Sequence, residues 1–234
     1  MGTPYRCGGC IGSWSPTYRS TYTEDLLAHC AGKACWHCAL KQGGKAVVTM
    51  LPVTVRVGNL EDDECRDRLT VFLPTQEFPF HLHQRRSRHE VESDISGGRY
   101  DTSLLLELWV AQEFAGFAAF EDIEDEGTML DLRIAASRRG QGVGTYALPI
   151  CCAHVFEHYP VRRIEGVTRQ DNLAMRKVFH NSGFVLESYY REGWSVGDRP
   201  VAALGYALLR SDWVQGTATP VPWSELLAQE ANLD

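Results

Sequence analysis

Three apolar runs in the middle of the chain are separated by short acidic or glycine-containing segments. The runs are SLLLELWVAQ, GFAAFED and GTMLDLRIAA, and together they occupy residues 103–136. Apolar runs of this length bounded by turn residues are typical of β-strands, and short connections join antiparallel neighbours. The pattern therefore predicts an antiparallel meander of three strands.

Helical and strand-like patterns alternate on both sides of this meander. The expected elements are a strand at 53–57, a short acidic helix at 60–69, an irregular stretch at 78–98, helices at 145–158 and 172–181, strands at 161–168 and 201–209, and a last short helix at 224–231. We expect an α+β fold in which helices flank a mixed, mostly antiparallel central sheet.

Composition divides the 234 residues into three segments. Residues 1–45 are rich in Gly, Ser, Thr and Cys with little apolar periodicity, and KQGGK ends them as a flexible joint. We predict a cysteine-rich module at 1–45, a main domain at 46–212 and a tail at 213–234.

The charge of the chain is unevenly distributed. The formal net charge is −7, which disfavours binding of nucleic acid by the whole chain, although residues 1–45 carry five Arg or Lys against two acidic residues. No apolar run approaches the roughly 18 to 20 residues of a membrane span, and the first residues lack the apolar stretch of a signal peptide. We expect a cytoplasmic protein without a membrane partner.

Five of the eight cysteines lie within the first 38 residues, and four of them form two C-x2-C pairs. In a reducing compartment this spacing favours a metal over disulfides, because two such pairs can present four thiolates to one tetrahedral zinc ion. Metal binding would also supply folding free energy to a segment with little core. We predict a zinc-ribbon-like module with a structural zinc, and the alternatives are free thiols or substitution by Cys30, His29 or His37. The predicted ligands are Cys7, Cys10, Cys35 and Cys38.

A glycine-rich turn, RRGQGVGT at residues 138–145, follows the third strand-like run and opens the next helix. Its glycines let backbone N–H groups approach an anion, and the helix N-terminus and two arginines add positive charge. No Gly-Lys-Ser/Thr ends the turn as in a P-loop, and its G-x-G-x-G spacing does not fit a dinucleotide fingerprint. The turn predicts a pyrophosphate site, with an unliganded strand-to-helix turn as the alternative.

Two signatures carry a resemblance to a known family. RGQGVG at 139–144 resembles the Arg/Gln-x-x-Gly-x-Gly/Ala signature of the GNAT superfamily of N-acetyltransferases, and NLAMRKVFHNSGF at 172–184 is similar to its second signature. The resemblance covers residues 46–212, and the end of that segment is similar to the ribosomal-protein-acetylating (Rim-type) branch. It implies a GNAT fold and transfer of an acetyl group from acetyl-CoA to a primary amine.

The resemblance also assigns residues to the binding of acetyl-CoA. Ile134 would pair with the pantetheine arm like an added strand, and Asn172 and Lys177 would contact the cofactor where the sheet splays open. For Asn172 a helix N-cap is the alternative, and one residue can do both. The glycine turn would hold the pyrophosphate with residues Arg139, Gly140, Gln141, Gly142, Val143, Gly144 and Thr145.

Acetyl transfer to an ammonium group needs a base, because an acceptor with a pKa near about 10.4 must first lose a proton. Glu165 and Asp131 interrupt apolar strands beside the expected cleft, and we rank Glu165 first because it directly precedes the second signature. Glu107 is a third candidate. An outward-facing carboxylate, or a structural ion pair with Arg133 or Arg163, is the alternative for each.

The general acid is missing from its usual place. Many relatives carry a Tyr on the second helix that protonates the CoA sulfur, and Phe179 occupies the matching position. A thiol with a pKa near about 8.5 leaves tolerably as a thiolate. Tyr189, Tyr190, His180 or a water molecule are the candidates to replace the acid.

The sequence leaves the acceptor open. The basic stretch 78–89 favours an acceptor with phosphate or carboxylate groups, unless His81, His83 and His89 form a metal site, whereas the acidic turn 121–126 favours a polyamine or aminoglycoside. The oligomeric state is also open.

A second hypothesis concerns the basic module at the front of the chain. In it, the chain is a nucleic-acid-binding or regulatory protein in which the zinc module acts and a degenerate GNAT domain senses acetyl-CoA. In either case the basic module could contact an RNA or protein substrate.

Overall fold

The computed structural model describes residues 53–231, and the four predicted zinc ligands lie outside them. No helix in this range combines the length and the apolar character needed to cross a membrane. The elements in chain order are β1 (Val53–Val57), α2 (Asp63–Thr75), α3 (Arg88–Ser96), β2 (Leu104–Val110), β3 (Glu113–Glu121), β4 (Gly127–Ile134), η1 (Ala136–Arg138), α4 (Val143–His158), β5 (Arg163–Arg169), α5 (Leu173–Asn181), β6 (Val185–Val196), β7 (Arg199–Leu209), α6 (Arg210–Gln215) and α7 (Trp223–Glu230).

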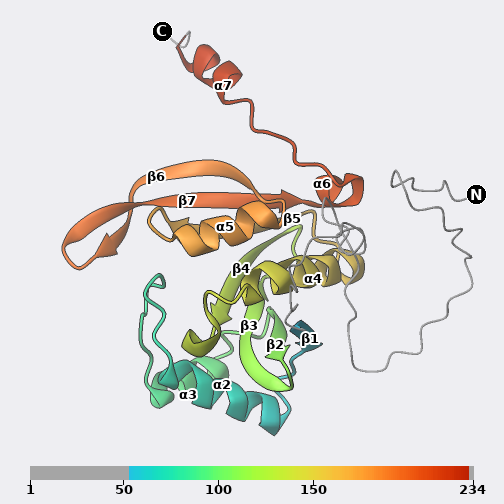
Figure 1. The fold of residues 1–234 in the computed structure, drawn as a ribbon, viewed down its shortest axis with the longest axis vertical. Coiled ribbons are helices and arrows are strands. Elements are labelled where there is room, and N and C mark those ends of the chain that lie inside the picture. Colours follow the sequence, from blue (N-terminus) through green and yellow to red (C-terminus); the bar gives the residue numbers. More distant parts are fainter. Residues whose placement is uncertain (1–52, 232–234) are drawn as a thin grey trace, which may run out of the picture.

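The strands form one sheet of seven in the order β1-β2-β3-β4-β5-β7-β6. All neighbours are antiparallel except β4 and β5, which are parallel. Helices α4 and α5 cover one face, and α2 and α3 cover the other (Figure 1). The structure therefore confirms the predicted mixed, mostly antiparallel sheet flanked by helices, including the three-stranded meander of β2, β3 and β4.

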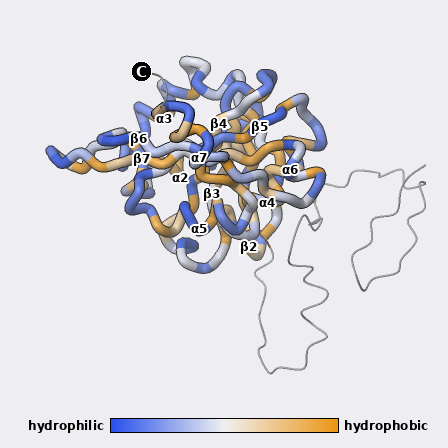
Figure 2. Tube along the Cα trace, turned by 90° about the horizontal axis from the view of Figure 1, so that it is seen from above, coloured by the Kyte–Doolittle hydropathy of each residue, from blue (hydrophilic) through white to orange (hydrophobic). Residues whose placement is uncertain are grey.

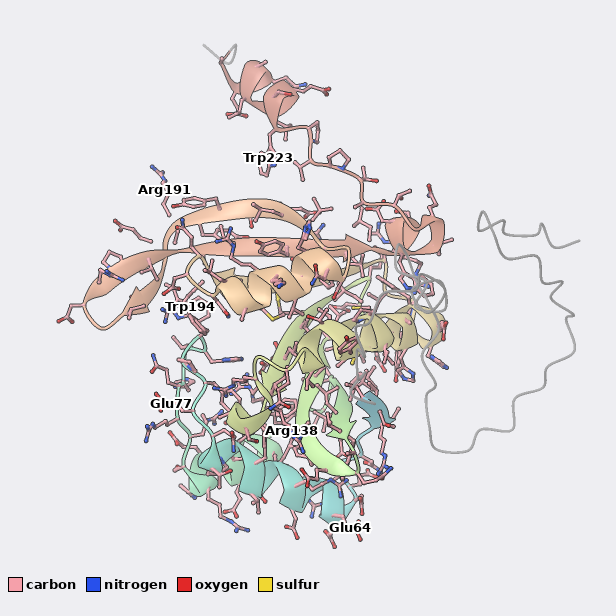
Figure 3. The ribbon with its side chains drawn as sticks, in the orientation of Figure 1. Glu64, Glu77, Arg138, Arg191, Trp194 and Trp223 are labelled. Carbon is pink, nitrogen blue, oxygen red and sulfur yellow. The ribbon has the colours of Figure 1, made fainter. Side chains whose placement is uncertain are left out.

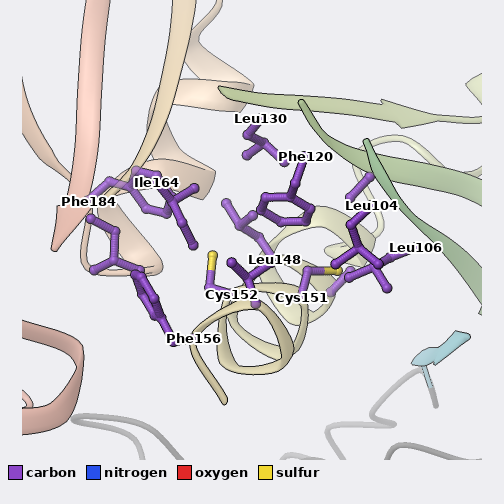
Figure 4. Close-up of a cluster of buried hydrophobic side chains, with 14 of the residues drawn as sticks. Leu104, Leu106, Phe120, Leu130, Leu148, Cys151, Cys152, Phe156, Ile164 and Phe184 are labelled. Carbon is purple, nitrogen blue, oxygen red and sulfur yellow. The ribbon is translucent and has the colours of Figure 1, made fainter. Parts of the chain in front are cut away.

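The larger core lies between α4 and the sheet (Figure 4). α4 is apolar along most of its length and contributes buried residues such as Leu148, Cys151 and Cys152, which pack against Phe120 of β3. Burial of each large apolar side chain contributes about 1.5–3 kcal/mol. Figure 2 shows hydrophobic stretches gathered at the centre of the molecule and a hydrophilic tip on the β6–β7 hairpin.

Alternation along β2 divides the core into two layers. Leu104, Leu106 and Leu108 face α4, whereas Leu105 faces α2 and α3, where Phe117 of β3 joins it. Both faces of the strand are buried because helices cover both sides of the sheet. This two-sided burial explains why β2 reads as a nearly continuous apolar run.

The starts of α2 and α3 differ from the predictions, because other residues than expected cap these helices. The helix predicted at 60–69 begins later, because Asn59 accepts a hydrogen bond from Glu61 N in a turn. α2 begins behind Asp62, whose carboxylate accepts from Glu64 N. The irregular stretch predicted at 78–98 is wrong in its second half, because Ser87 and Glu90 form a capping box that starts α3.

Candidate active site

The sheet opens between β4 and β5. These strands pair only at Gly127↔Arg163, Thr128↔Ile164 and Met129↔Glu165. Beyond that point β4 continues along β3 to Ile134, and β5 continues along β7 to Arg169. The two strands diverge, and beyond the paired positions their facing edges have no strand partner among residues 53–231. Such free backbone edges can pair with an extended ligand as an added strand would.

The glycine turn joins β4 to α4 directly beside this split. Gly140 and Gly142 have φ angles of +74° and +87°, which lie in the left-handed region that favours glycine. A Cβ on Gly144 would lie 3.1 Å from Ile134 Cδ1 and 3.3 Å from Val178 Cγ2. The third glycine therefore lets the start of α4 approach both β4 and α5.

The N-terminus of α4 has donors for an anion. The N-cap residue is Gly142, which has no side chain to cap the helix, and Tyr146 N donates to Gly142 O at 3.1 Å. The N–H groups of residues 143–145 have no carbonyl one turn back to accept from them. Together with the helix dipole they form a site that suits phosphate oxygens. A Cβ on Gly140 would meet no atom within 4 Å, so the turn is open on that side.

The polar side chains of the turn hold it in place. Arg139 Nε donates to Ile134 O at 2.9 Å and its Nη2 donates to Glu77 O at 2.7 Å. Gln141 Nε2 donates to Ser137 O at 2.7 Å. Arg138, which is labelled in Figure 3, pairs with Glu113. Arg139 thus fastens the turn to β4 and to the segment after α2.

Asn172 is the N-cap of α5. Its Oδ1 accepts from Met175 N at 3.2 Å, and its Nδ2 donates to Thr168 Oγ1 at 2.9 Å. The capping role predicted as an alternative is confirmed, and these bonds tie the end of β5 to the start of α5. Lys177 lies exposed on α5. Contacts of Asn172 and Lys177 with acetyl-CoA stay predictions.

Phe179 is a core residue rather than a proton donor. Its ring is 1% exposed and stacks on Tyr206 with the ring centroids 4.8 Å apart. A Cβ on Gly166 of β5 would lie 2.4 Å from Phe179 Cζ, so glycine at that position makes room for the ring. Among the predicted replacements, Tyr189 donates from its hydroxyl to Gln170 Oε1 at 3.4 Å, and Tyr190 is half exposed.

Asp131 lies on β4, two residues after the last pair with β5, and its side chain is on the face of the sheet that α2 and α3 cover. Its carboxylate accepts from Arg133 Nε at 2.9 Å and from His81 Nε2 at 3.1 Å. Burial opposes ionisation of Asp131, but the hydrogen bond from His81 and the charge of Arg133 outweigh it and hold the pKa of this carboxyl below its ordinary value. Asp131 is therefore an anion near neutral pH. The alternative of an ion pair with Arg133 is confirmed.

The other two carboxylates lie in different surroundings. Glu165 lies at the last paired position of β5, and its carboxylate accepts from Arg163 Nε at 2.6 Å. The ion pair predicted as its alternative is therefore present. Glu107 is buried on β2, where it accepts from Arg68 Nε at 2.8 Å and from Trp109 Nε1 at 3.1 Å. Glu107 is thus a core ion pair away from the split.

Sequence reasoning did not connect His81 or the loop around it with Asp131. Residues 78–84, hereafter the bridging loop, connect α2 and α3 and lie across the split. His81 binds Asp131 of β4, and Arg169 of β5 donates from Nη1 to Pro79 O at 3.0 Å. The histidines and arginines of 78–89 were a signal for this site, but their contacts depend on how the loop folds.

No group of three or more His, Cys, Asp or Glu among residues 53–231 is placed to hold a metal ion. The predicted alternative of a metal site from His81, His83 and His89 is therefore not found. His81 binds Asp131, and His89 lies on α3.

The split parallel pair, the glycine turn at the N-terminus of α4 and the capping Asn of α5 define a GNAT-type fold. The model of a family described as "Acetyltransferase (GNAT) domain" matches residues 61–185 of this chain. The chain belongs to this family, and the matched range contains the split, the glycine turn and α5.

Solved structures of acetyltransferases share the fold. Spermidine N-acetyltransferase from Vibrio cholerae in complex with CoA and spermine aligns with a TM-score of 0.56 at 17% identity, over 69% of this chain and 98% of that one. A RimL ribosomal L7/L12 alpha-N-protein acetyltransferase in complex with coenzyme A aligns with a TM-score of 0.53 at 18% identity, over 67% of this chain and 93% of that one. An acetyltransferase from Salmonella typhimurium that modifies the N-terminal serine of ribosomal protein L7/L12 aligns with a TM-score of 0.54 at 20% identity, over 67% of this chain and 94% of that one.

Proposed function

We propose that this chain transfers an acetyl group from acetyl-CoA directly to a primary amine. The observation that supports the proposal most strongly is the split between β4 and β5 with the glycine turn beside it. The free edge of β4 suits the amide groups of a pantetheine arm, and the N-terminus of α4 suits a pyrophosphate. Residues 139–145, Ile134 and Asn172 would hold acetyl-CoA in this arrangement.

The acceptor amine would enter from the side of α2 and α3. The bridging loop, Asp131 and Arg133 lie on that face, whereas α4 and α5 close the other face with the larger core. A buried carboxylate with a shifted pKa beside a cleft is a candidate for a catalytic role. We therefore place the proton transfer at the Asp131 cluster. Glu165, at the last paired position of β5, is the competing base.

The function is tested by supplying acetyl-CoA with a panel of amines. The panel includes a peptide with an N-terminal serine, spermidine and a small primary amine, because relatives with this fold are named for the first two classes. We expect release of CoA thiol that depends on the amine, and a mono-acetylated amine identified by mass spectrometry. Binding of acetyl-CoA without transfer to any amine would instead favour the sensing hypothesis, which the comparisons do not support.

Direct transfer predicts that no acetylated enzyme forms. Among residues 53–231 the three cysteines are buried, and burial raises the pKa of Cys151 to about 12 and of Cys65, next to Glu107, to about 11. A buried thiol with a raised pKa is a poor nucleophile. Intact mass measurement after incubation with acetyl-CoA alone should show the unmodified chain. An acetyl adduct that forms and decays as fast as turnover would contradict direct transfer.

A further inference from the structure

The bridging loop has a fixed geometry over the split. Phe78 N donates to Gln84 O at 2.7 Å, and His81 N donates to Phe78 O at 3.0 Å, so the loop closes on itself. Two of its hydrogen bonds come from opposite sides of the split, one with Asp131 on β4 and one with Arg169 on β5. The imidazole of His81 is therefore held beside the split, on the side from which we propose that the acceptor enters.

The contact with Asp131 determines which nitrogen of His81 carries a proton. Asp131 is ionised and can only accept, so Nε2 at 3.1 Å must be the N–H donor. In the neutral imidazole the lone pair is then on Nδ1. A carboxylate that fixes a histidine tautomer in this way is a common means of presenting the other nitrogen as a base.

The Nδ1 atom of His81 is buried and has no hydrogen-bond partner among residues 53–231. The Nη1 atom of Arg133, on the same carboxylate, is also buried and unpartnered, and the side chain of Arg133 is 9% exposed. Buried polar atoms in native proteins almost always have partners, and exceptions gather where a ligand or water completes the site. No group among residues 53–231 satisfies Nδ1, so a ligand or water molecule that enters the site would be its first partner.

We propose that His81 is the general base of acetyl transfer, acting through Nδ1, and that Asp131 is the positioning residue that orients it. The proposal rests on the proposed function. Nδ1 takes a proton from the ammonium group of the acceptor, and the neutral nitrogen then forms a bond to the thioester carbonyl carbon. The carbon–sulfur bond breaks, the sulfur leaves with the electron pair and is protonated, and one proton is released to solvent overall.

An imidazole suits this step better than an ion-paired carboxylate. Imidazole titrates near about 6.5, whereas an unperturbed carboxyl titrates near about 4, and the acceptor ammonium titrates near about 10.4. A base whose pKa is closer to the operating pH is a more effective proton acceptor while still being free of its proton. Asp131, already bound to Arg133 and His81, has little basicity to offer.

The pH dependence of the rate must be assigned among His81 and the charged and titratable groups on the neighbouring elements. Asp131 and Arg133 lie on β4, and Arg169 reaches the loop from β5. Tyr100 precedes β2, and burial followed by the charge of Asp131 raises its pKa. Arg133 and Arg169 keep their charge throughout the range in which imidazole titrates, and the raised pKa of Tyr100 keeps its hydroxyl protonated there. Loss of the acid limb in a His81 variant would therefore be assigned to His81 and not to these neighbours.

The test compares His81→Gln with His83→Gln. His83 lies exposed in the same loop, two residues away, and serves as the matched control. With the amine found in the panel, we expect His81→Gln to lower kcat by about 10²-fold or more, to leave the KM for acetyl-CoA within a factor of about two, and to remove the acid limb from the pH profile. His83→Gln should retain the wild-type profile. Asp131→Asn should lower kcat less and displace the acid limb.

A measurement on the resting protein separates this inference from the proposed function. Nitrogen-15 NMR of the imidazole side chains, assigned by the signal lost in His81→Gln, should show His81 with the proton on Nε2. A proton on Nδ1 would overturn the inference even if the enzyme is active. A wild-type rate and an intact acid limb in His81→Gln, with a 10²-fold loss in Glu165→Gln, would overturn it as well and assign the base to Glu165. Failure of every amine in the panel would instead overturn the proposed function.

Discussion

Gly142→Asp should lower the affinity for acetyl-CoA by at least about 100-fold. Gly142 is the N-cap of α4, and its φ of +87° places any added side chain at the entrance of the proposed pyrophosphate site. A carboxylate about 5 Å from a phosphate charge interacts unfavourably by about 3 kcal/mol at an effective dielectric constant of about 20. That free energy corresponds to a factor of about 100 in the dissociation constant.

Gly142→Asn is the matched control for this variant. Asn and Asp have nearly the same size, both tolerate the left-handed region, and both would place Cβ at 3.1 Å from the Tyr146 ring. Isothermal calorimetry with acetyl-CoA should show a modest loss for Asn and a severe loss for Asp. Equal losses would assign the effect to backbone geometry, and unchanged affinity in the Asp variant would contradict the pyrophosphate site.

Gly116→Ala should destabilise the domain by about 3 kcal/mol or more and distort β4 at the split. Gly116 lies on β3 opposite Ile134, with a φ of +146°. A Cβ there would lie 2.0 Å from Arg133 O and 2.9 Å from Ile134 Cα, and both are backbone atoms that cannot rotate away. Strain in a disfavoured backbone region and overpacking each cost about 1–3 kcal/mol.

The melting temperature should fall by roughly 10 °C, because about 1 kcal/mol shifts it by about 2–4 °C in a domain of this size. Gly197→Ala, in the β6–β7 turn, is the control. Its φ is +57°, but an added Cβ would meet no atom within 4 Å, so only the backbone strain of about 1 kcal/mol remains. Similar melting temperatures for the two variants would show that β4 can move aside at no cost.

Local sequence patterns determined the meander and the glycine turn. Leu104–Val110 and the two runs that follow it form strands because they are apolar, short and separated by turn residues, and no distant contact is needed to say so. The glycine turn was equally readable. Gly140 and Gly142 have positive φ angles, which glycine adopts without strain. The turn and the start of the helix therefore follow from local chemistry.

Strand β6 shows where local patterns fail. Leu186, Tyr189 and Tyr190 are exposed, and charged residues are interspersed, so the segment lacks the alternation of a half-buried strand. It is a strand because β7 offers a free edge along its length. The α6 helix, which ends at Gly216 in the left-handed region, was also missed, since six residues carry too little periodicity.

The proposed proton-transfer site depends on tertiary structure alone. In the sequence, Glu165 and Asp131 look alike, because each is a single carboxylate in an apolar strand. The structure distinguishes them, because Glu165 is in the last pair between β4 and β5 and Asp131 lies beyond it. His81 is 50 residues from Asp131 in the chain. Its role depends on a loop closed by backbone hydrogen bonds and held by Arg169, and no periodicity or motif encodes that contact. Residue types determined which chemistry was available, and the long-range packing of the loop against the split determined which residues can perform it.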